Sequence, residues 1–267
     1  MQRAHERALP LSDGAKTVVE TWGAQGPLIV GVHGLGGSRR GWARIAEHLA
    51  ERYRVVAYDQ RGHGDSGAKG PMTFERGLQD LEEVVASLGE PVRALVGHSW
   101  GGAVVVAGGR RIGAVGRVAA IDPMLRVDEG VWTKNVLPEY QKMFAQTLEE
   151  REASIRASYA ALPGIEVESK LHATRRLTYD PVAALGAENE IDAGKWDFRE
   201  LVRDYPKPLL IAVADPKRSV VPEAEREEYR ARGGANVRVE VFAGASHSLQ
   251  RDAFDRFIPV LEEFLAA

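Results

Sequence analysis

Short aliphatic runs that are apolar on both faces recur along this chain and alternate, in its first half, with helical patterns. Five of these runs lie at residues 27–32, 54–58, 92–96, 117–121 and 208–213. Strands of this kind are typical of a sheet buried between two layers of helices. Since a helical crossover returns the chain to the same edge of the sheet, neighbouring strands run parallel. The alternation therefore predicts the α/β class, with a mostly parallel central sheet flanked by helices.

Two segments depart from this alternation. Residues 5–22 have the pattern of two strands around a Ser-Asp-Gly turn, which predicts a β-hairpin because Asp-Gly tolerates positive φ angles. Residues 123–205 contain no convincing strand and are too long for a structureless loop. We expect residues 1–122 and 206–267 to form the core domain, and residues 123–205 to be inserted as a helical cap. Helical stretches of this cap are predicted at 138–161, 167–177 and 198–205.

The composition excludes several classes of protein and of site. The chain has 267 residues, 35 Lys plus Arg against 38 Asp plus Glu, a formal net charge of −3 and no cysteine. A chain of this length buries a full core without disulfides, and the lack of cysteine excludes thiolate metal sites and a cysteine nucleophile. The near-neutral charge predicts no nucleic-acid partner. Without a secretory signal or an apolar window of about 18 residues, we expect no membrane partner and a cytoplasmic location.

No motif predicts a cofactor or a metal ion. The sequence has no P-loop, no His-Glu-x-x-His and no other metal-ligand spacing. Residues 62–67 formally match the G-x-G-x-x-G of dinucleotide sites, but that motif must open a helix. Here Pro71 intervenes and the next helical pattern starts near Thr73. We therefore expect neither a cofactor nor a metal ion.

A glycine-rich segment after the predicted strand at 92–96 carries the strongest chemical signal. Residues 97–102 are Gly-His-Ser-Trp-Gly-Gly, and a helical pattern follows. A serine on a sharp strand-to-helix turn needs small neighbours two positions away, here Gly97 and Gly101. The turn exposes the hydroxyl, and the start of the helix offers N–H groups to developing negative charge. Ser99 is therefore the candidate nucleophile.

A second glycine-rich segment supplies a candidate oxyanion site. Residues 32–38 are Val-His-Gly-Leu-Gly-Gly-Ser and follow the predicted strand at 27–32. Acyl transfer needs two convergent N–H donors, one from the residue after the nucleophile and one from a loop after an earlier strand. The backbone N–H groups of Trp100 and Leu35 fit these two places.

A serine nucleophile needs a base, and His247 is the best candidate among the seven histidines. It lies between the last predicted strand and the last helix, and the ordinary pKa of imidazole suits proton transfer at neutral pH. His33 and His98 flank the two glycine-rich segments, where we expect them to orient backbone rather than perform chemistry.

The base in turn needs a buried carboxylate that fixes its tautomer. Asp215 follows the predicted strand at 208–213, and Asp122 follows the preceding strand. The chain order Ser99, Asp215, His247 is the one expected of an α/β-hydrolase and favours Asp215. Asp122 is the alternative acid and is otherwise expected to be a substrate-binding residue.

With these motifs the sequence resembles the α/β-hydrolase superfamily over essentially its whole length. Residues 58–66 are similar to the family's D-x-R-G-x-G-x-S turn, and residues 247–252 to the usual surroundings of its catalytic histidine. The insertion at 123–205 has the position of the family's cap. The resemblance implies the α/β-hydrolase fold and a triad whose acid is Asp215. The segment between this residue and Pro222 is, however, longer than is usual in the family.

The combined pattern predicts a carboxylesterase-like serine hydrolase that cleaves a small, apolar ester or lactone through an acyl-enzyme. A serine at position 99 argues against haloalkane dehalogenases and epoxide hydrolases, whose nucleophile is an aspartate. The alternatives are a carbon–carbon bond hydrolase, a perhydrolase and a non-catalytic small-molecule receptor. From the cap, Trp132, Tyr140 and Trp196 are expected to line the substrate pocket. The sequence leaves the oligomeric state open.

Overall fold

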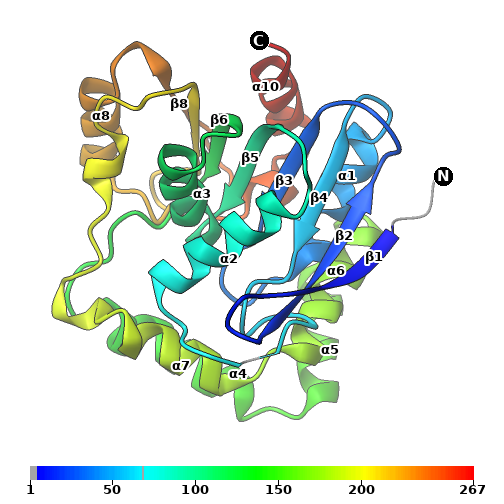
Figure 1. Cartoon of the computed structure of the whole chain (residues 1–267). Coiled ribbons are helices and arrows are strands. Elements are labelled where there is room, and N and C mark those ends of the chain that lie inside the picture. The colour runs from blue at the N-terminus through cyan, green and yellow to red at the C-terminus, as the bar shows by residue number, and fades with distance from the viewer. Residues whose placement is uncertain (1–4, 68) are drawn as a thin grey trace.

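The strands form one eight-stranded sheet within residues 5–67 and 69–267, which the computed structural model describes (Figure 1). The strand order is β1-β2-β4-β3-β5-β6-β7-β8. β1 and β2 form the predicted hairpin, β2 is also antiparallel to β4, and the other neighbouring pairs are parallel, which confirms the predicted α/β class. The strands are β1 (His5–Pro10), β2 (Lys16–Trp22), β3 (Leu28–Val32), β4 (Arg54–Tyr58), β5 (Val92–His98), β6 (Val115–Ile121), β7 (Leu209–Val213) and β8 (Val237–Val241).

The central strands are apolar on both faces because each face packs against its own layer of helices. In β3, Leu28, Val30 and Val32 join one hydrophobic cluster, and Ile29, between Leu28 and Val30, joins the other. Burying apolar side chains on both faces removes the strands from water and stabilises the sheet. The first cluster is covered by α2 (Phe74–Ala86), α3 (Trp100–Arg111) and α8 (Glu223–Arg232), and the second by α1 (Ala43–Leu49) and α10 (Phe254–Ala266).

The segment between β6 and β7 is helical, but its helices differ from the prediction. The predicted helix at 138–161 is two helices, because Thr147 starts a new one with a capping box to Glu150. The predicted helix at 198–205 is wrong, since only a short 3-10 turn forms there. The helices are α4 (Leu137–Phe144), α5 (Leu148–Ser158), α6 (Gly164–Arg176) and α7 (Tyr179–Glu188). The short turns of the chain are η1 (Arg39–Trp42), η2 (Trp132–Val136, a π-turn), η3 (Ile191–Ala193), η4 (Arg199–Val202) and η5 (Gly234–Asn236).

Helices α4 to α7 gather at one end of the molecule, next to the loop that leaves the carboxyl end of β3 (Figure 1). The Oγ of Ser169 in α6 donates to the backbone carbonyl of Arg40 at 2.6 Å. The Nζ of Lys170 donates to that of Gly36 at 3.4 Å. The division of the chain into a core and a cap at residues 123 and 205 stays a prediction. No helix in the described part of the chain is long and apolar enough to cross a membrane.

Candidate active site

Ser99 lies in the sharp turn between β5 and α3, in a strained backbone conformation. Its φ is +56° and its ψ is −118°, a region that residues with side chains seldom adopt. A Cβ atom at Gly97 would lie 2.2 Å from the carbonyl oxygen of Gly101, and one at Gly101 would lie 2.3 Å from that of Val32. Only glycine fits at both positions without moving backbone. The structure thus has the strand–turn–helix geometry expected from residues 97–102.

His247 is paired with Asp122, the alternative acid of the sequence analysis. Its Nδ1 lies 2.6 Å from Oδ2 of Asp122. Because a carboxylate can only accept, Nδ1 carries the proton, and Nε2 is the nitrogen left to accept one. His247 lies in the loop between β8 and the short helix α9 (Leu249–Asp252). The pairing gives His247 the tautomer that a general base requires.

Asp122 is fully buried and fully hydrogen-bonded. Besides the bond to His247, it accepts hydrogen bonds from the backbone N–H of Ala214 at 3.0 Å, from Oγ of Ser219 at 2.5 Å and from the N–H of Val220 at 3.0 Å. A buried carboxylate is stable only when such donors replace its water shell. Three of its four partners therefore hold this carboxylate in place for the imidazole.

The structure contradicts the expectation that Asp215 orients His247. The carboxylate of Asp215 accepts from the backbone N–H of Gly244 at 2.7 Å and of Lys217 at 3.0 Å. These two N–H groups lower the pKa of Asp215. The longer segment after β7 explains the difference: Asp215 binds the start of this segment, and Ser219 and Val220 further along it bind Asp122. Asp122 itself is enclosed behind His247 and does not line the cavity, so its alternative role in substrate binding is also wrong.

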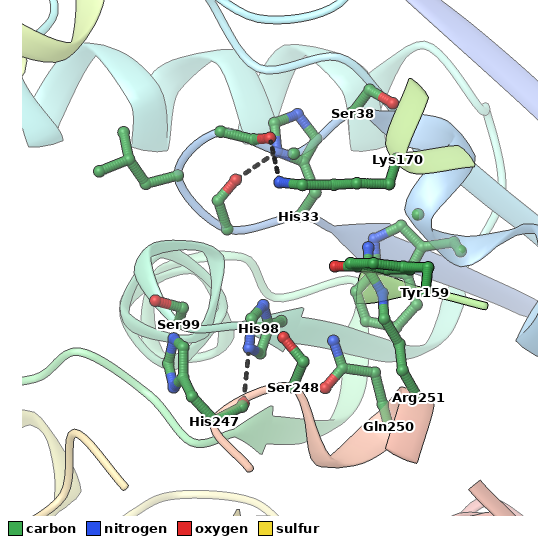
Figure 2. A pocket seen from close by; sticks show the side chains of 16 residues that line it. His33, Ser38, His98, Ser99, Tyr159, Lys170, His247, Ser248, Gln250 and Arg251 are labelled. Carbon is green, nitrogen blue, oxygen red and sulfur yellow. Dashed lines mark hydrogen bonds between the residues drawn. The ribbon is translucent and has the colours of Figure 1, made fainter. Parts of the chain in front are cut away.

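The histidines next to the two glycine-rich segments bind backbone, as the sequence predicts. His98 donates from Nε2 to the backbone carbonyl of His247 at 2.9 Å (Figure 2). His33 bonds Gly34 O from Nδ1 at 2.8 Å and accepts from Gln60 N at Nε2, at 3.0 Å. Burial lowers the pKa of His33 to about 3, so the ring is neutral at physiological pH. These rings fix the loops that carry Leu35 and His247.

One cavity of about 140 Å³ contains both Ser99 and His247 (Figure 2). Leu35 also lines it, and Trp100 follows Ser99 as the first residue of α3, where helix N–H groups lack intrahelical partners. Both residues proposed for the oxyanion site therefore lie next to the nucleophile. The lining residues are His33, Gly34, Leu35, Gly36, Gly37, Ser38, Gly41, Trp42, His98, Ser99, Tyr159, Lys170, His247, Ser248, Gln250 and Arg251.

The aromatic residues predicted to line this pocket do not do so. Trp196 stacks on the Trp100 ring at 4.5 Å between centroids and donates from Nε1 to Met124 O at 2.7 Å. Trp132 is buried against Gly186. Tyr140 packs with its hydroxyl against Gly36 and is not among the residues that line the cavity. The two tryptophans belong to the hydrophobic core. The prediction failed because an apolar pattern in a helix does not distinguish a packed residue from a residue in a pocket wall.

Sequence reasoning missed the polar residues that face Ser99 across the cavity. Tyr159 follows α5, Lys170 lies on α6, and Arg251 lies on α9 (Figure 2). One signal was available: α6 buries the polar residues Glu166, Ser169 and His172 alongside Leu171 and Ala173, so its packed face is partly polar. No group of three or more His, Cys, Asp or Glu side chains in the described residues is arranged to hold a metal ion.

The curated proteins similar to this chain are named for different activities. Probable oxidoreductase EphD of Mycobacterium tuberculosis and of Mycobacterium bovis is 38% identical over 120 residues, which are 43% of this chain but 20% of EphD. The matched part is thus about a fifth of the length of these relatives. A non-heme haloperoxidase of Rhodococcus erythropolis is 29% identical over 255 residues, or 89% of this chain and 91% of the relative.

Comparisons with solved structures agree on the fold. E-2-(acetamidomethylene)succinate hydrolase superposes with a TM-score of 0.81 at 20% identity, over 99% of this chain and all of the other. The enol-lactonase of Burkholderia xenovorans LB400 gives 0.76 at 21% identity, over 98% of this chain and all of the other. A family model described as the alpha/beta hydrolase family matches residues 29–260. The chain therefore belongs to the alpha/beta hydrolase family.

Proposed function

We propose that this chain is a serine hydrolase that cleaves a small carboxylic ester or lactone, with Ser99 as nucleophile, His247 as general base and Asp122 as the orienting carboxylate. The observation that carries the proposal is a strained Ser99 in the same cavity as an imidazole whose Nδ1 is bound to a buried aspartate. Groups of these three types, in these relations, perform acyl transfer on several unrelated folds.

The first half of the reaction forms an acyl-enzyme. Nε2 of His247 takes the proton of the Ser99 hydroxyl while Oγ of Ser99 bonds to the carbonyl carbon of the substrate. The carbonyl oxygen becomes an oxyanion that accepts hydrogen bonds from the backbone N–H groups of Leu35 and Trp100. Collapse of this intermediate breaks the bond to the alkoxy oxygen, which receives the proton from His247. Asp122 stabilises the imidazolium that exists between these steps.

Water completes the reaction. His247 takes a proton from a water molecule as that water attacks the ester bond to Ser99, and a second oxyanion forms in the same place. When Ser99 leaves, its oxygen recovers the proton from His247, and the carboxylic acid departs. A lactone follows the same steps, except that its alkoxy oxygen stays attached to the released hydroxy acid.

Covalent labelling with a fluorophosphonate, together with a turnover screen of short-chain esters and lactones, tests this function. We expect labelling of the folded protein, loss of labelling in Ser99→Ala, and retention in Ser248→Ala, a second serine of the same cavity. Failure of the wild type to be labelled or to hydrolyse any ester or lactone would instead favour a small-molecule receptor. Labelling that persists in Ser99→Ala would remove Ser99 from the mechanism.

A further inference from the structure

The charge of the cavity lining is one-sided. Among its 16 lining residues, all in the described part of the chain, Lys170 and Arg251 are cationic and none is Asp or Glu. Two carboxylates contact lining residues from behind: Asp122 is bound to His247, and Glu166 lies 3.2 Å from Arg251. A cavity with fixed positive charge and no acceptor carboxylate favours an anionic ligand.

Lys170 extends from α6 across the cavity from Ser99 and His247 (Figure 2). Its Nζ donates one long hydrogen bond, 3.4 Å, to the carbonyl oxygen of Gly36, and it forms no ion pair within residues 5–67 and 69–267. Burial, and secondarily the nearby Arg251, lowers the pKa of Lys170 to about 8, so the amine is mostly charged at neutral pH. Removing an ammonium from water without a partner is costly, and an anion in the cavity would offset that cost.

Arg251, near this ammonium, contacts two other side chains. Its Nη1 donates to the hydroxyl oxygen of Tyr159 at 2.9 Å, and its Nε lies 3.2 Å from Oε2 of Glu166. Glu166 offsets part of the guanidinium charge, so the net positive charge of the pair of cations comes mainly from Lys170. Tyr159 accepts from Arg251, which leaves its own O–H to donate to a ligand. The three side chains form a donor cluster without a competing acceptor carboxylate in the cavity.

The size of the cavity limits the ligand. Its volume of about 140 Å³ is close to that of an engineered cavity of about 150 Å³ that holds one benzene molecule. An acyl group of roughly four to six carbons fills such a space. Lys170 lies across this cavity from Ser99 (Figure 2), so the far end of an acyl group bound at Ser99 is directed toward the side that carries Lys170.

We propose that Lys170, supported by Arg251 and Tyr159, binds a carboxylate at the far end of the acyl group, so that the preferred substrates are small half-esters of dicarboxylic acids or lactones that carry a carboxylate. This inference rests on the proposed hydrolase function and specifies its substrate class. It replaces the apolar substrate expected from the sequence.

Matched pairs of esters test the proposal. Monoethyl succinate and monoethyl glutarate are compared with the ethyl esters in which an amide replaces the free carboxylate, and ethanol release is measured at pH 7. We expect kcat/KM of the wild type to be about tenfold or more higher for the acids, because a hydrogen bond to a charged group is roughly twice as strong as a neutral one. Equal kcat/KM for the acid and the amide would overturn the proposal.

Variants locate the preference. Lys170→Gln should lower kcat/KM for the acids by about 10- to 100-fold and leave the amides within about twofold. Lys170→Arg should keep the preference, as should Lys142→Gln, which removes the same charge from an exposed position on α4. A Lys170→Gln protein that loses the same factor on acids and amides would show a structural role and overturn the subsite. Should Lys170→Gln not fold, the pH dependence of the acid-to-amide ratio decides: it should fall between pH 7 and pH 9 in the wild type and in Lys142→Gln, and stay flat in Lys170→Arg.

Binding of glutarate itself separates this inference from the hydrolase function. Calorimetry of the wild type and of Lys170→Gln with glutarate needs no chemistry at Ser99. If the wild type is neither labelled by fluorophosphonate nor active, the hydrolase function fails, and glutarate binding that is lost in Lys170→Gln still supports the carboxylate subsite. Absence of glutarate binding to the wild type, or equal binding to both proteins, would overturn the subsite, whatever the labelling shows.

Discussion

The two sides of the cavity are built in different ways. We call the side formed by Ser99 and His247, with Asp122 behind them, the floor, and the side formed by Tyr159 and Lys170 the roof. Floor residues follow strand ends, and each is fixed by strained backbone or by a short hydrogen bond. Roof residues come from the helical segment after β6, where Lys170 makes one long hydrogen bond. Changes in the floor should therefore abolish turnover, whereas changes in the roof should alter the choice of substrate.

Loss of the nucleophile or the base should have the largest effect. Ser99→Ala and His247→Ala should each lower kcat by about 10⁶, and the double variant should be hardly worse, because the two groups act as one unit. Single-turnover and steady-state rates with one ester, measured on protein whose circular dichroism matches that of the wild type, check this. Additive losses in the double variant would contradict a shared mechanism.

The two aspartates give the next largest contrast. Asp122→Asn should lower kcat by about 10⁴, because an amide presents the wrong partner to Nδ1 of His247. Asp215→Asn should stay within about threefold, since its carboxylate binds only backbone N–H groups outside the cavity. Both rates are measured with the same ester. A larger loss of kcat in Asp215→Asn than in Asp122→Asn would show that Asp215 is the orienting carboxylate.

The preference for an acid substrate, which we assign to the roof, should depend on pH. The preference for an acid over its amide should fall by about tenfold between pH 7 and pH 9, because the ammonium of Lys170, with its pKa of about 8, is lost as the pH rises. Burial lowers the pKa of His33 and of His63, and the charge of Lys170 lowers both further, so these two rings are neutral over the whole window. Taking the ratio of kcat/KM for the acid and the amide cancels any pH effect that the two substrates share. In Lys170→Arg the acid-to-amide ratio should not change with pH. An unchanged ratio in the wild type would show that the ammonium of Lys170 does not recognise the carboxylate.

Buried histidines should give the smallest effect, on stability rather than on rate. Burial lowers the pKa of His172 to about 4, below its ordinary value, so the unfolded chain binds more protons than the folded one below about pH 6.5. The stabilisation is complete above that pH and is lost as the pH falls. His172→Gln should reduce the loss between pH 6.5 and 5.5 by about 1 kcal/mol. Urea denaturation of both proteins at the two pH values measures the free energy of unfolding. An equal loss of stability in His172→Gln and the wild type would show that burial does not shift the pKa of His172.

The sequence predicts the floor better than the roof for a physical reason. A buried strand has an unmistakable apolar pattern, and the residues 97–102 admit one backbone geometry, so β4 lies at residues 54–58 as predicted and Ser99 lies at the turn. An aspartate after a strand carries no comparable signal. Whether Asp122 or Asp215 reaches His247 depends on the path of the segment after β7, which only tertiary contacts determine.

The roof depends on which face of each helix meets the sheet, and periodicity alone does not specify this. Trp132 and Trp196 have the pattern of an apolar face and pack in the core, whereas the polar Lys170 faces the substrate space. Long cationic side chains are usually assigned to solvent in a sequence, because their aliphatic stems reach water from many positions. The polar residues on the packed face of α6 were the only local sign of a site there.

The hydrogen bond from His98 to the backbone of His247 couples two segments that are 149 residues apart in the chain. His98 immediately precedes the nucleophile, and the acceptor is the backbone carbonyl of the base itself. One hydrogen bond therefore joins the two segments directly beside the reacting side chains. We expect this bond to limit independent motion of the loop after β8 and the turn after β5, which carry the imidazole and the serine. The spacing between serine and imidazole should therefore depend more on this bond than on the position of the helices above them.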